Sequence, residues 1–378
     1  MNRYLCVLFI GLFLAVSVGQ TATLHVPSEY PNIQDAITHA VSGDIVLVAD
    51  GVYIGAGNTS ISPQGKSISI ESENGPHACV IDGQNTLSGF TCTQSEPPGC
   101  IIRGFTIRNA YRSNGGAILC SASPSIQNCR FVNCSAGFGG AIQFSGSRTT
   151  PSLTGCLFIS NTADERGGAI YSSISMMANS PPTDGAIDAS GPNLTVTRCV
   201  FDGNAASTGG AVDLNDSGLQ MEASQFSGNQ GYSGAAIHLN ANSEGTINNT
   251  LFSGNSSLGP GIVLQFNSEL RIQNCNFSNN DTGGEGILDL TGSRDAIVYN
   301  VIFDSNLNTA LYAASESQIL NCLFDHNLQY DYWDPFVGYL DGADVINIES
   351  IYARACKSGS PAYNHGPSGN WTSPLVFD

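Results

Sequence analysis

Charged residues are scarce in this chain, and lysine is almost absent. Only 12% of its 378 residues are charged, with 13 Lys and Arg against 31 Asp and Glu, and the net charge is −18. Lysine occurs only at Lys66 and Lys357. Nucleic acids and anionic membranes recruit proteins through Lys and Arg, so this composition argues against both as partners. The acidic residues are scattered along the chain rather than gathered in one tail, which is typical of a soluble surface.

Long apolar runs are also absent beyond the first twenty residues. Arg3 precedes an apolar stretch from Tyr4 to Val18, which ends in small residues. This arrangement is typical of a secretory signal peptide, which we place at residues 1–19 with cleavage near Gly19. The stretch is short for a membrane span, and no other segment is long enough to cross a bilayer. The sequence therefore predicts a secreted or cell-surface protein with no membrane span after cleavage.

Cysteine is plentiful by contrast, with 12 residues. Eleven of them remain after signal cleavage, in a compartment that permits disulfides. Cys92 and Cys100 flank a short loop that contains Pro97, Pro98 and Gly99, and we predict a disulfide between them. Several other cysteines recur at a fixed position of a repeat, where strands in register point their Cβ atoms in parallel. That arrangement favours free, buried thiols. Six scattered histidines beside such a column do not form a tetrahedral cage, so we predict no metal and no cofactor.

A repeat of about 25 residues runs through the chain, and a period in this range indicates a solenoid. Phenylalanine marks it at Phe105, Phe131, Phe158, Phe201, Phe226, Phe252, Phe277, Phe303 and Phe324. Seven of these begin a Phe-x-x-Asn tetrapeptide, which ends at Asn161, Asn204, Asn229, Asn255, Asn280, Asn306 or Asn327. Between consecutive phenylalanines lies Gly-Gly-Ala-Ile or a looser copy, and the first four copies begin at Gly115, Gly139, Gly167 and Gly209.

The apolar runs within each unit are short and alternate with polar residues, which is strand spacing rather than helical spacing. Three short strands per unit, separated by Gly and Asn turns, describe one coil of an all-β, right-handed parallel β-helix. Equivalent residues of stacked coils lie roughly 4.8 Å apart. We therefore predict a buried Phe column and a stacked amide ladder. We also predict left-handed or bridge-region backbones at Asn249, Asn274, Asn300 and Asn321.

The alternating Gly-Gly-Ala-Ile and Phe-x-x-Asn tetrapeptides resemble the repeats of the polymorphic outer membrane proteins. The resemblance covers roughly residues 105–327. It implies a surface-displayed passenger or adhesin. The chain after the repeats is too short for the autotransporter domain of those relatives, so we expect its anchoring to differ.

The beginning of the chain resembles the opening of pectin-lyase-like β-helices, through His25-Val26-Pro27, Ile33-Gln34-Asp35-Ala36-Ile37 and the apolar run after Gly43. The resemblance implies that Ile33–Ile37 is a short helix that caps the first coil. A cap is needed because the first coil has an unpaired edge and an apolar interior. We therefore expect an N-terminal cap and first coil at residues 20–55, repeats at 56–329 and a C-terminal cap at 330–378.

The strand that follows each Gly-Gly-Ala turn is expected to form a ligand-binding lane, which is a row of outward side chains on consecutive coils. Its Ile points inward, so the Ala before it and the residue after it should point outward. On consecutive coils the residues after the Ile are Gln143, Tyr171, Asp213 and His238, beside an insertion at roughly residues 173–192. The pectin-lyase-like resemblance implies that this face holds sugar chains. Asp213 and His238 are candidates for an acid/base pair.

The sequence favours a non-catalytic extracellular protein that binds a glycan or another protein, and we expect it to be a monomer. The alternative is a pectin-lyase-like polysaccharide lyase or glycoside hydrolase. Such lyases pair Ca²⁺-binding carboxylates with an Arg or Lys base, and glycosidases use paired carboxylates. The Asn-Thr-Asp, Asp-Asp and Gly-His-Gly patterns of polygalacturonases do not occur. If the source is eukaryotic, sequons predict N-glycosylation at Asn58, Asn133, Asn193, Asn215, Asn248, Asn255, Asn276, Asn280 and Asn370.

Overall fold

The computed structural model describes residues 21–174, 191–292, 295–313 and 317–328, together with three short strands near the C-terminus. These strands are β37 (Tyr332–Asp334), β38 (Gly338–Leu340) and β39 (Val345–Ile348). The predicted signal peptide, the Asn370 sequon and most of the predicted C-terminal cap lie outside the described residues.

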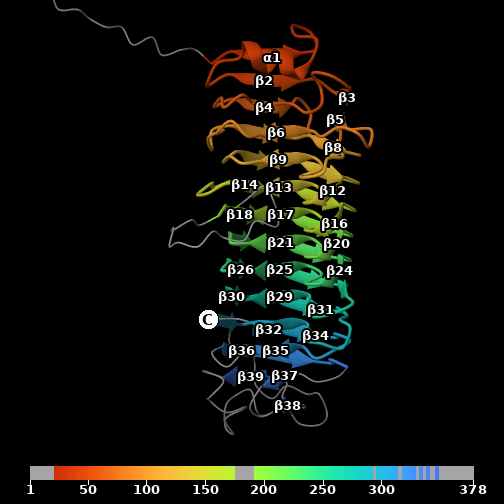
Figure 1. The fold of residues 1–378 in the computed structure, drawn as a ribbon, viewed down its shortest axis with the longest axis vertical. Helices are drawn as coiled ribbons and strands as arrows, with labels where there is room; N and C mark the ends of the chain where they lie inside the picture. The colour runs from red at the N-terminus through yellow and green to blue at the C-terminus, as the bar shows by residue number, and fades with distance from the viewer. Residues whose placement is uncertain are drawn as a thin grey trace, which may run out of the picture.

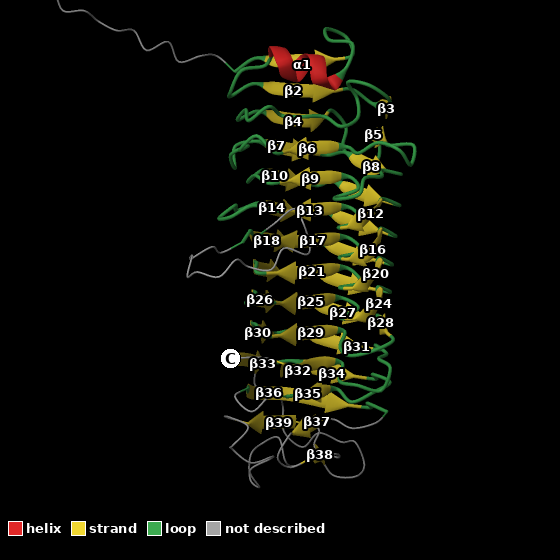
Figure 2. Cartoon of the chain, in the orientation of Figure 1, coloured by secondary structure: helices red, strands yellow, loops and turns green. Residues whose placement is uncertain are grey.

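The chain winds into a stack of coils along one long axis (Figure 1). Consecutive coils pair through parallel strands and form three sheets, of 23, 11 and five strands. A regular coil runs through β14 (Ser152–Thr154), β15 (Leu157–Ile159), β16 (Thr162–Arg166) and β17 (Ile170–Ser173). β14 and β15 both belong to the 23-stranded sheet, so the coil has three sides (Figure 2). It has four strands, where three strands per coil were predicted.

The remaining strands follow the same plan. The 23-stranded sheet also contains β1 (Thr23–Val26), β2 (Ile45–Val48), β3 (Gly51–Tyr53), β4 (Ser69–Ser72), β5 (Cys79–Asp82), β7 (Ile101–Arg103), β8 (Thr106–Arg108), β10 (Ser125–Gln127), β11 (Arg130–Val132), β18 (Asn193–Thr197), β19 (Val200–Asp202), β22 (Gly218–Glu222), β23 (Gln225–Ser227), β26 (Glu244–Asn248), β27 (Leu251–Ser253), β30 (Glu269–Gln273), β31 (Asn276–Ser278), β33 (Asp295–Tyr299), β34 (Ile302–Asp304), β36 (Gln318–Asp325) and β39. The 11-stranded sheet contains β6 (Phe90–Cys92), β9 (Ile118–Cys120), β13 (Ile142–Phe144), β17, β21 (Val212–Asn215), β25 (Ile237–Asn240), β29 (Val263–Phe266), β32 (Leu288–Gly292), β35 (Leu311–Tyr312), β37 and β38. The five-stranded sheet contains β12 (Ser135–Phe138), β16, β20 (Ala205–Thr208), β24 (Gln230–Ser233) and β28 (Ser256–Ser257).

The predicted N-terminal helix is confirmed as α1 (Ile33–His39), which lies over β1 and β2 at the end of the stack (Figure 1). Its apolar side, which includes Ile33 and Ile37, is buried. Asn32 caps its N-terminus, because the side-chain oxygen accepts the Asp35 N–H at 2.8 Å. The Lys66 ammonium donates to the Ile37 carbonyl at 2.6 Å, at the other end of the helix.

The predicted Phe column is confirmed and forms the centre of the core. Phe131, Phe158, Phe201, Phe226, Phe252, Phe277, Phe303 and Phe324 are buried. Their neighbouring rings stack at centroid separations of 4.5–5.1 Å. Phe105 does not belong to this column, because Ile107 is the register partner of Phe131. Phe105 instead lies two positions earlier, where the later units carry cysteine, and its ring packs against Phe90.

The Phe-x-x-Asn asparagines form the predicted amide ladder. Asn204, for example, donates its side-chain N–H to the Asn229 side-chain oxygen at 3.0 Å and to the Phe158 carbonyl at 3.1 Å. The Asn229 side-chain oxygen also accepts the Asn204 backbone N–H at 3.0 Å. Each amide thus satisfies a backbone N–H and a backbone carbonyl of the preceding coil, which leaves few polar groups unpaired.

The ladder also bears on the predicted glycosylation sites. Asn255 and Asn280 are buried, and their side-chain nitrogens are hydrogen-bonded within the ladder. A glycan on either nitrogen does not fit the folded coil. Asn133 and Asn193 are exposed, so their sequons remain compatible with the fold.

The asparagine that lies three residues before the Phe in several coils forms the predicted bend. Asn249, Asn274, Asn300 and Asn321 have φ values of 51°, 53°, 54° and 53°, in the left-handed region that asparagine tolerates. The Asn300 amide donates to the Asn274 side-chain oxygen at 2.8 Å across neighbouring coils. This bend separates the two segments that each coil contributes to the 23-stranded sheet.

The predicted Cys92–Cys100 disulfide is wrong, because both residues are free and buried in the structure. Cys92 ends β6 and lies in register with Cys120 of β9, whereas Cys100 precedes β7 on a different sheet. The cysteines of the repeat position, at 129, 156, 199, 275 and 322, are free and buried, as expected. Burial raises the pKa of the Cys275 and Cys322 thiols to about 12, which makes them inert apolar packing groups.

The Phe column predicts that two Phe→Ala variants differ strongly in their free energy of unfolding. Phe252→Ala should lower the free energy of unfolding by about 3–5 kcal/mol, because it removes a ring stacked on both sides. Phe266→Ala is the matched control, since its side chain is 59% exposed and should cost within about 0.5 kcal/mol. Urea unfolding of both variants checks the prediction, and equal losses would contradict it.

Candidate functional site

The four residues of the predicted lane do lie in one column. Gln143 on β13 pairs in register with Tyr171 on β17, Tyr171 pairs with Asp213 on β21, and Asp213 pairs with His238 on β25. The column continues through Leu264 and Asp289 on the next two coils. The predicted register of this face is therefore correct.

The prediction that these side chains are exposed is wrong. Gln143, Tyr171 and Asp213 are 0% exposed, and His238 is 7% exposed. Neighbouring coils pack closely at the Gly-Gly turn, where a Cβ at Gly140 would overlap the Thr162 carbonyl oxygen of the five-stranded sheet in the next coil. Side chains from the ends of that sheet therefore cover the column. The Phe138 ring, for example, packs 5.5 Å from the Tyr171 ring.

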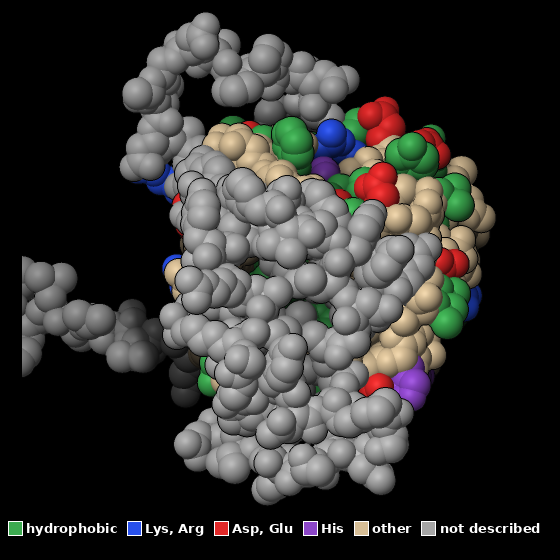
Figure 3. Space-filling model, turned by 90° about the horizontal axis from the view of Figure 1, so that it is seen from below, with side chains coloured by type: hydrophobic (Ala, Val, Ile, Leu, Met, Phe, Trp, Pro, Cys, Tyr) green, Lys and Arg blue, Asp and Glu red, His purple; other side chains and the backbone are tan. Residues whose placement is uncertain are grey.

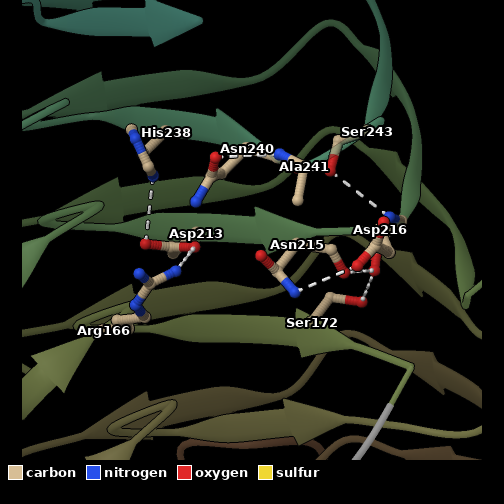
Figure 4. Close-up of polar contacts among 10 residues, drawn as sticks. Arg166, Ser172, Asp213, Asn215, Asp216, His238, Asn240, Ala241 and Ser243 are labelled. Atoms are coloured by element: carbon tan, nitrogen blue, oxygen red, sulfur yellow. Dashed lines mark hydrogen bonds and ion pairs between the residues drawn. The ribbon is translucent and has the colours of Figure 1, made fainter. Parts of the chain in front are cut away.

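Asp213 lies at the centre of a buried ionic cluster (Figure 4). The His238 Nδ1 atom is 3.3 Å from one carboxylate oxygen. Arg166, at the end of β16, places a guanidinium nitrogen 3.7 Å from the other oxygen. Figure 4 shows the two partners on opposite sides of the carboxylate, each from a neighbouring coil. The predicted contact between Asp213 and His238 is therefore present, but Asp213 has no access to solvent.

Gln143, Tyr171 and Asp289 of the column are also polar and buried. Both side-chain amide atoms of Gln143 lack a hydrogen-bond partner among the described residues. Burial raises the pKa of the Tyr171 phenol and the pKa of the Asp289 carboxyl. Asp289 accepts hydrogen bonds from the Thr291 backbone N–H at 2.9 Å and from its hydroxyl at 2.6 Å. The Asp289 hydrogen bonds are local to one strand, and these buried side chains offer no open surface to a substrate.

An open groove instead lies on the five-stranded sheet. This lateral groove has a volume of about 490 Å³ and is lined by residues of β16, β20, β24 and β28 and by Leu258. One column across it consists of Thr162, Ala205, Gln230 and Ser256, which pair in register on consecutive coils. The small side chains of Ala163, Ala205, Ala206 and Gly231 keep it open.

Two exposed apolar side chains lie on one side of the lateral groove. The Tyr232 side chain is 63% exposed and Leu258 is 78% exposed. A Cβ at Gly259 would lie 3.3 Å from the Tyr232 ring, so the absence of a side chain there leaves room for the ring. Polar groups of Asp164, Ser207 and Gln230 complete the lining. The combination of one ring, small residues and several polar groups resembles a small-molecule site in composition.

Sequence reasoning did not find the lateral groove or Arg166. The segment after each Phe-x-x-Asn differs from coil to coil, from Thr162–Arg166 to Gln230–Ser233, so no repeated motif marks it. The only available signal was the run of small residues Ala205-Ala206-Ser207 beside the exposed Tyr232 of the next coil.

One group in the described part of the chain has the spacing of metal ligands. The Asp304 and Asp325 carboxylates and a His326 ring nitrogen lie within 4.8 Å of one another. The His326 Nδ1 atom is 2.8 Å from Asp325, and the imidazole is exposed. These side chains are already paired with one another at the surface, as solvated groups commonly are.

Two family models match the chain. The right-handed β-helix region model matches residues 178–303, and the Chlamydia polymorphic membrane protein repeat model matches residues 155–173. The chain is a right-handed parallel β-helix with polymorphic-membrane-protein-type repeats. The matched repeat at residues 155–173 contains one Phe-x-x-Asn tetrapeptide, which begins at Phe158, and one Gly-Gly-Ala-Ile tetrapeptide, which begins at Gly167.

Other comparisons add little to this identification. A solved structure of a mutant PL6-family alginate lyase, AlyGC, shows 13% identity and a TM-score of 0.41 to this chain. The match covers 80% of this β-helix and 47% of the lyase chain, so the β-helix spans about half the length of the lyase. No curated protein matches the chain. Among the described residues, the structure contains no helix that is long and apolar enough to cross a membrane.

The buried Asp289 carboxyl predicts a pH-dependent stability effect. Its pKa in the folded chain is raised above the unfolded value of about 3.9, so its contribution to stability is lost as the pH rises through the folded pKa. Asp289→Asn keeps an oxygen acceptor for Thr291 and removes the charge. The variant should therefore be more stable than wild type near pH 7 and equally stable near pH 3.

Urea unfolding at both pH values tests this effect. Asp202→Asn is the control, because Asp202 is exposed and should change stability within about 0.5 kcal/mol at both pH values. A loss of stability in Asp289→Asn near pH 7 would show that the carboxylate is stabilised where it lies.

Proposed function

We propose that this β-helix is a non-catalytic extracellular protein that binds an extended glycan in the lateral groove. The observation that carries the proposal is the Tyr232 ring, 63% exposed beside a channel of small residues that crosses four coils. An aromatic ring offers a flat apolar surface for a sugar face. The hydroxyl and amide groups of Ser207, Gln230 and Ser256 offer hydrogen bonds to sugar hydroxyls.

The dimensions of the lateral groove support a chain-like ligand. The groove crosses four coils spaced roughly 4.8 Å apart, so its first and last coils are about 14 Å apart. Its volume of about 490 Å³ lies within the range of roughly 300–1,000 Å³ for small-molecule sites. A short oligosaccharide laid along the stack axis fits both measures.

The lining residues support binding rather than catalysis. Glycosidases need two carboxylates across the scissile bond, and lyases need a base with cation-binding carboxylates. Among the described residues that line the lateral groove, Asp164 is the only acidic residue, and none is Lys, Arg or His. The Asp213–His238 pair is buried elsewhere. A lyase or hydrolase activity therefore has less support than simple binding.

An extracellular or surface location is part of the same proposal. The polymorphic membrane protein repeat is the supporting match. The acidic surface fits this location, because Asp and Glu side chains are spread around the visible rim of the molecule rather than gathered in one patch (Figure 3). The predicted signal peptide and the predicted monomeric state belong to this proposal as well.

A glycan array followed by calorimetric titration tests the function. Tyr232→Ala should weaken binding of any confirmed oligosaccharide by about tenfold or more, because the ring supplies the main apolar contact. Ala205→Leu should also weaken binding, because its side chain lies between the exposed Thr162 and Gln230 and would fill the groove.

Phe266→Ala is the matched control, since Phe266 is 59% exposed and lies outside the five-stranded sheet. It should leave the affinity unchanged. A Tyr232→Ala variant that binds as tightly as wild type would contradict the proposed site. Reducing-sugar and unsaturated-product assays on the bound glycan test the enzymatic alternative, and we expect no product.

A further inference from the structure

We infer that the lateral groove selects uncharged glycans and rejects polyuronates. This inference rests on the proposed glycan-binding function and concerns the charge of the ligand. It is drawn from the charged groups that lie in and beside the groove.

Carboxylates lie at both ends of the lateral groove. Asp164 lines it on β16, and the exposed Glu165 follows directly on the same strand. At the other end, Asp281 pairs in register with Ser256, and so extends the outward column by one further coil. The Asp281 carboxylate accepts a hydrogen bond from the Asn308 amide at 2.9 Å, which holds it in place. A ligand along this column therefore has negative charge at each end of its path.

Positive charge that could compensate a uronate is held away from the lateral groove. Among the described residues, none that lines it is basic. The nearest cation on the same strand is Arg166, at the end of β16. Its guanidinium is directed toward the buried Asp213 carboxylate, 3.7 Å away, on the 11-stranded sheet. Asp213 thus neutralises the one cationic side chain that β16 carries.

These charges set different conditions for the two classes of sugar chain. The carboxylates of a polyuronate at the two ends of the lateral groove would meet like charges, and no lining residue would supply a counterion. Like charges in a site disfavour binding. Hydroxyl groups of a neutral sugar can donate hydrogen bonds to Asp164 and Asp281, and such charge-assisted bonds are strong. The same groups that repel a uronate therefore favour a neutral chain.

The test compares matched hexasaccharides. We would titrate the full chain with neutral xylohexaose, cellohexaose and fully N-acetylated chitohexaose, and with hexagalacturonate and hexamannuronate. We expect at least one neutral chain to bind in a Tyr232-dependent manner, and each uronate to bind about tenfold more weakly or not at all. Asp164→Lys should then raise the affinity for a uronate by about fivefold or more at low salt, and the gain should fall as salt is added.

Glu244→Lys is the control for net charge, because Glu244 is exposed on β26 of the 23-stranded sheet and the charge change is identical. It should give no gain in uronate binding. Tyr232-dependent binding of uronates by the wild type would overturn the charge selectivity and leave the glycan-binding function standing. Equal gains in Asp164→Lys and Glu244→Lys would also overturn it. Failure of every hexasaccharide to bind would overturn both the selectivity and the proposed function.

Discussion

The in-register hydrogen bonding between successive coils is the constraint on which the rest of this molecule depends. Parallel strands place each residue directly over its counterpart one coil away, as in the Phe201–Phe226 and Phe226–Phe252 pairs. A side chain that fits one coil must therefore fit its copies above and below. Flat rings and primary amides meet this condition, because rings stack on rings and an amide both donates to and accepts from its neighbour.

This constraint is also why the fold could be predicted from the sequence. The Phe column, the Asn ladder and the left-handed Asn bend each repeat the same local chemistry many times, so the pattern is readable without knowledge of distant contacts. Asn274 and Asn300 illustrate the point, since the same residue meets the same backbone requirement in both coils. The cap α1 was predictable for a related reason. An open coil end needs a cover, and Ile33–Ile37 has the apolar residues to provide it.

The candidate site was only partly predictable, because its exposure depends on packing within a single coil. Alternation along a strand shows that Gln143 and Tyr171 point away from the interior. It does not show that side chains at the ends of the five-stranded sheet, such as Phe138, cover them. The predicted disulfide failed for a similar reason. Cys92 and Cys100 are close in sequence, but the register pairs Cys92 with Cys120 of the next coil. The pairing of coils, rather than distance along the chain, decides which side chains meet.

The same register allows the residue type to vary more in some columns of the stack than in others. The Phe column and the Asn ladder keep one residue type over most coils, because each ring or amide is the partner of the next. The outward column of the five-stranded sheet carries no such condition, and it reads Thr162, Ala205, Gln230, Ser256 and Asp281. A ligand that lies along the axis meets one of these residues per coil. The different side chains on successive coils therefore determine which ligand binds. Substitutions in this column can therefore change which ligand binds without disturbing the stack, whereas substitutions in the Phe column change the stack itself.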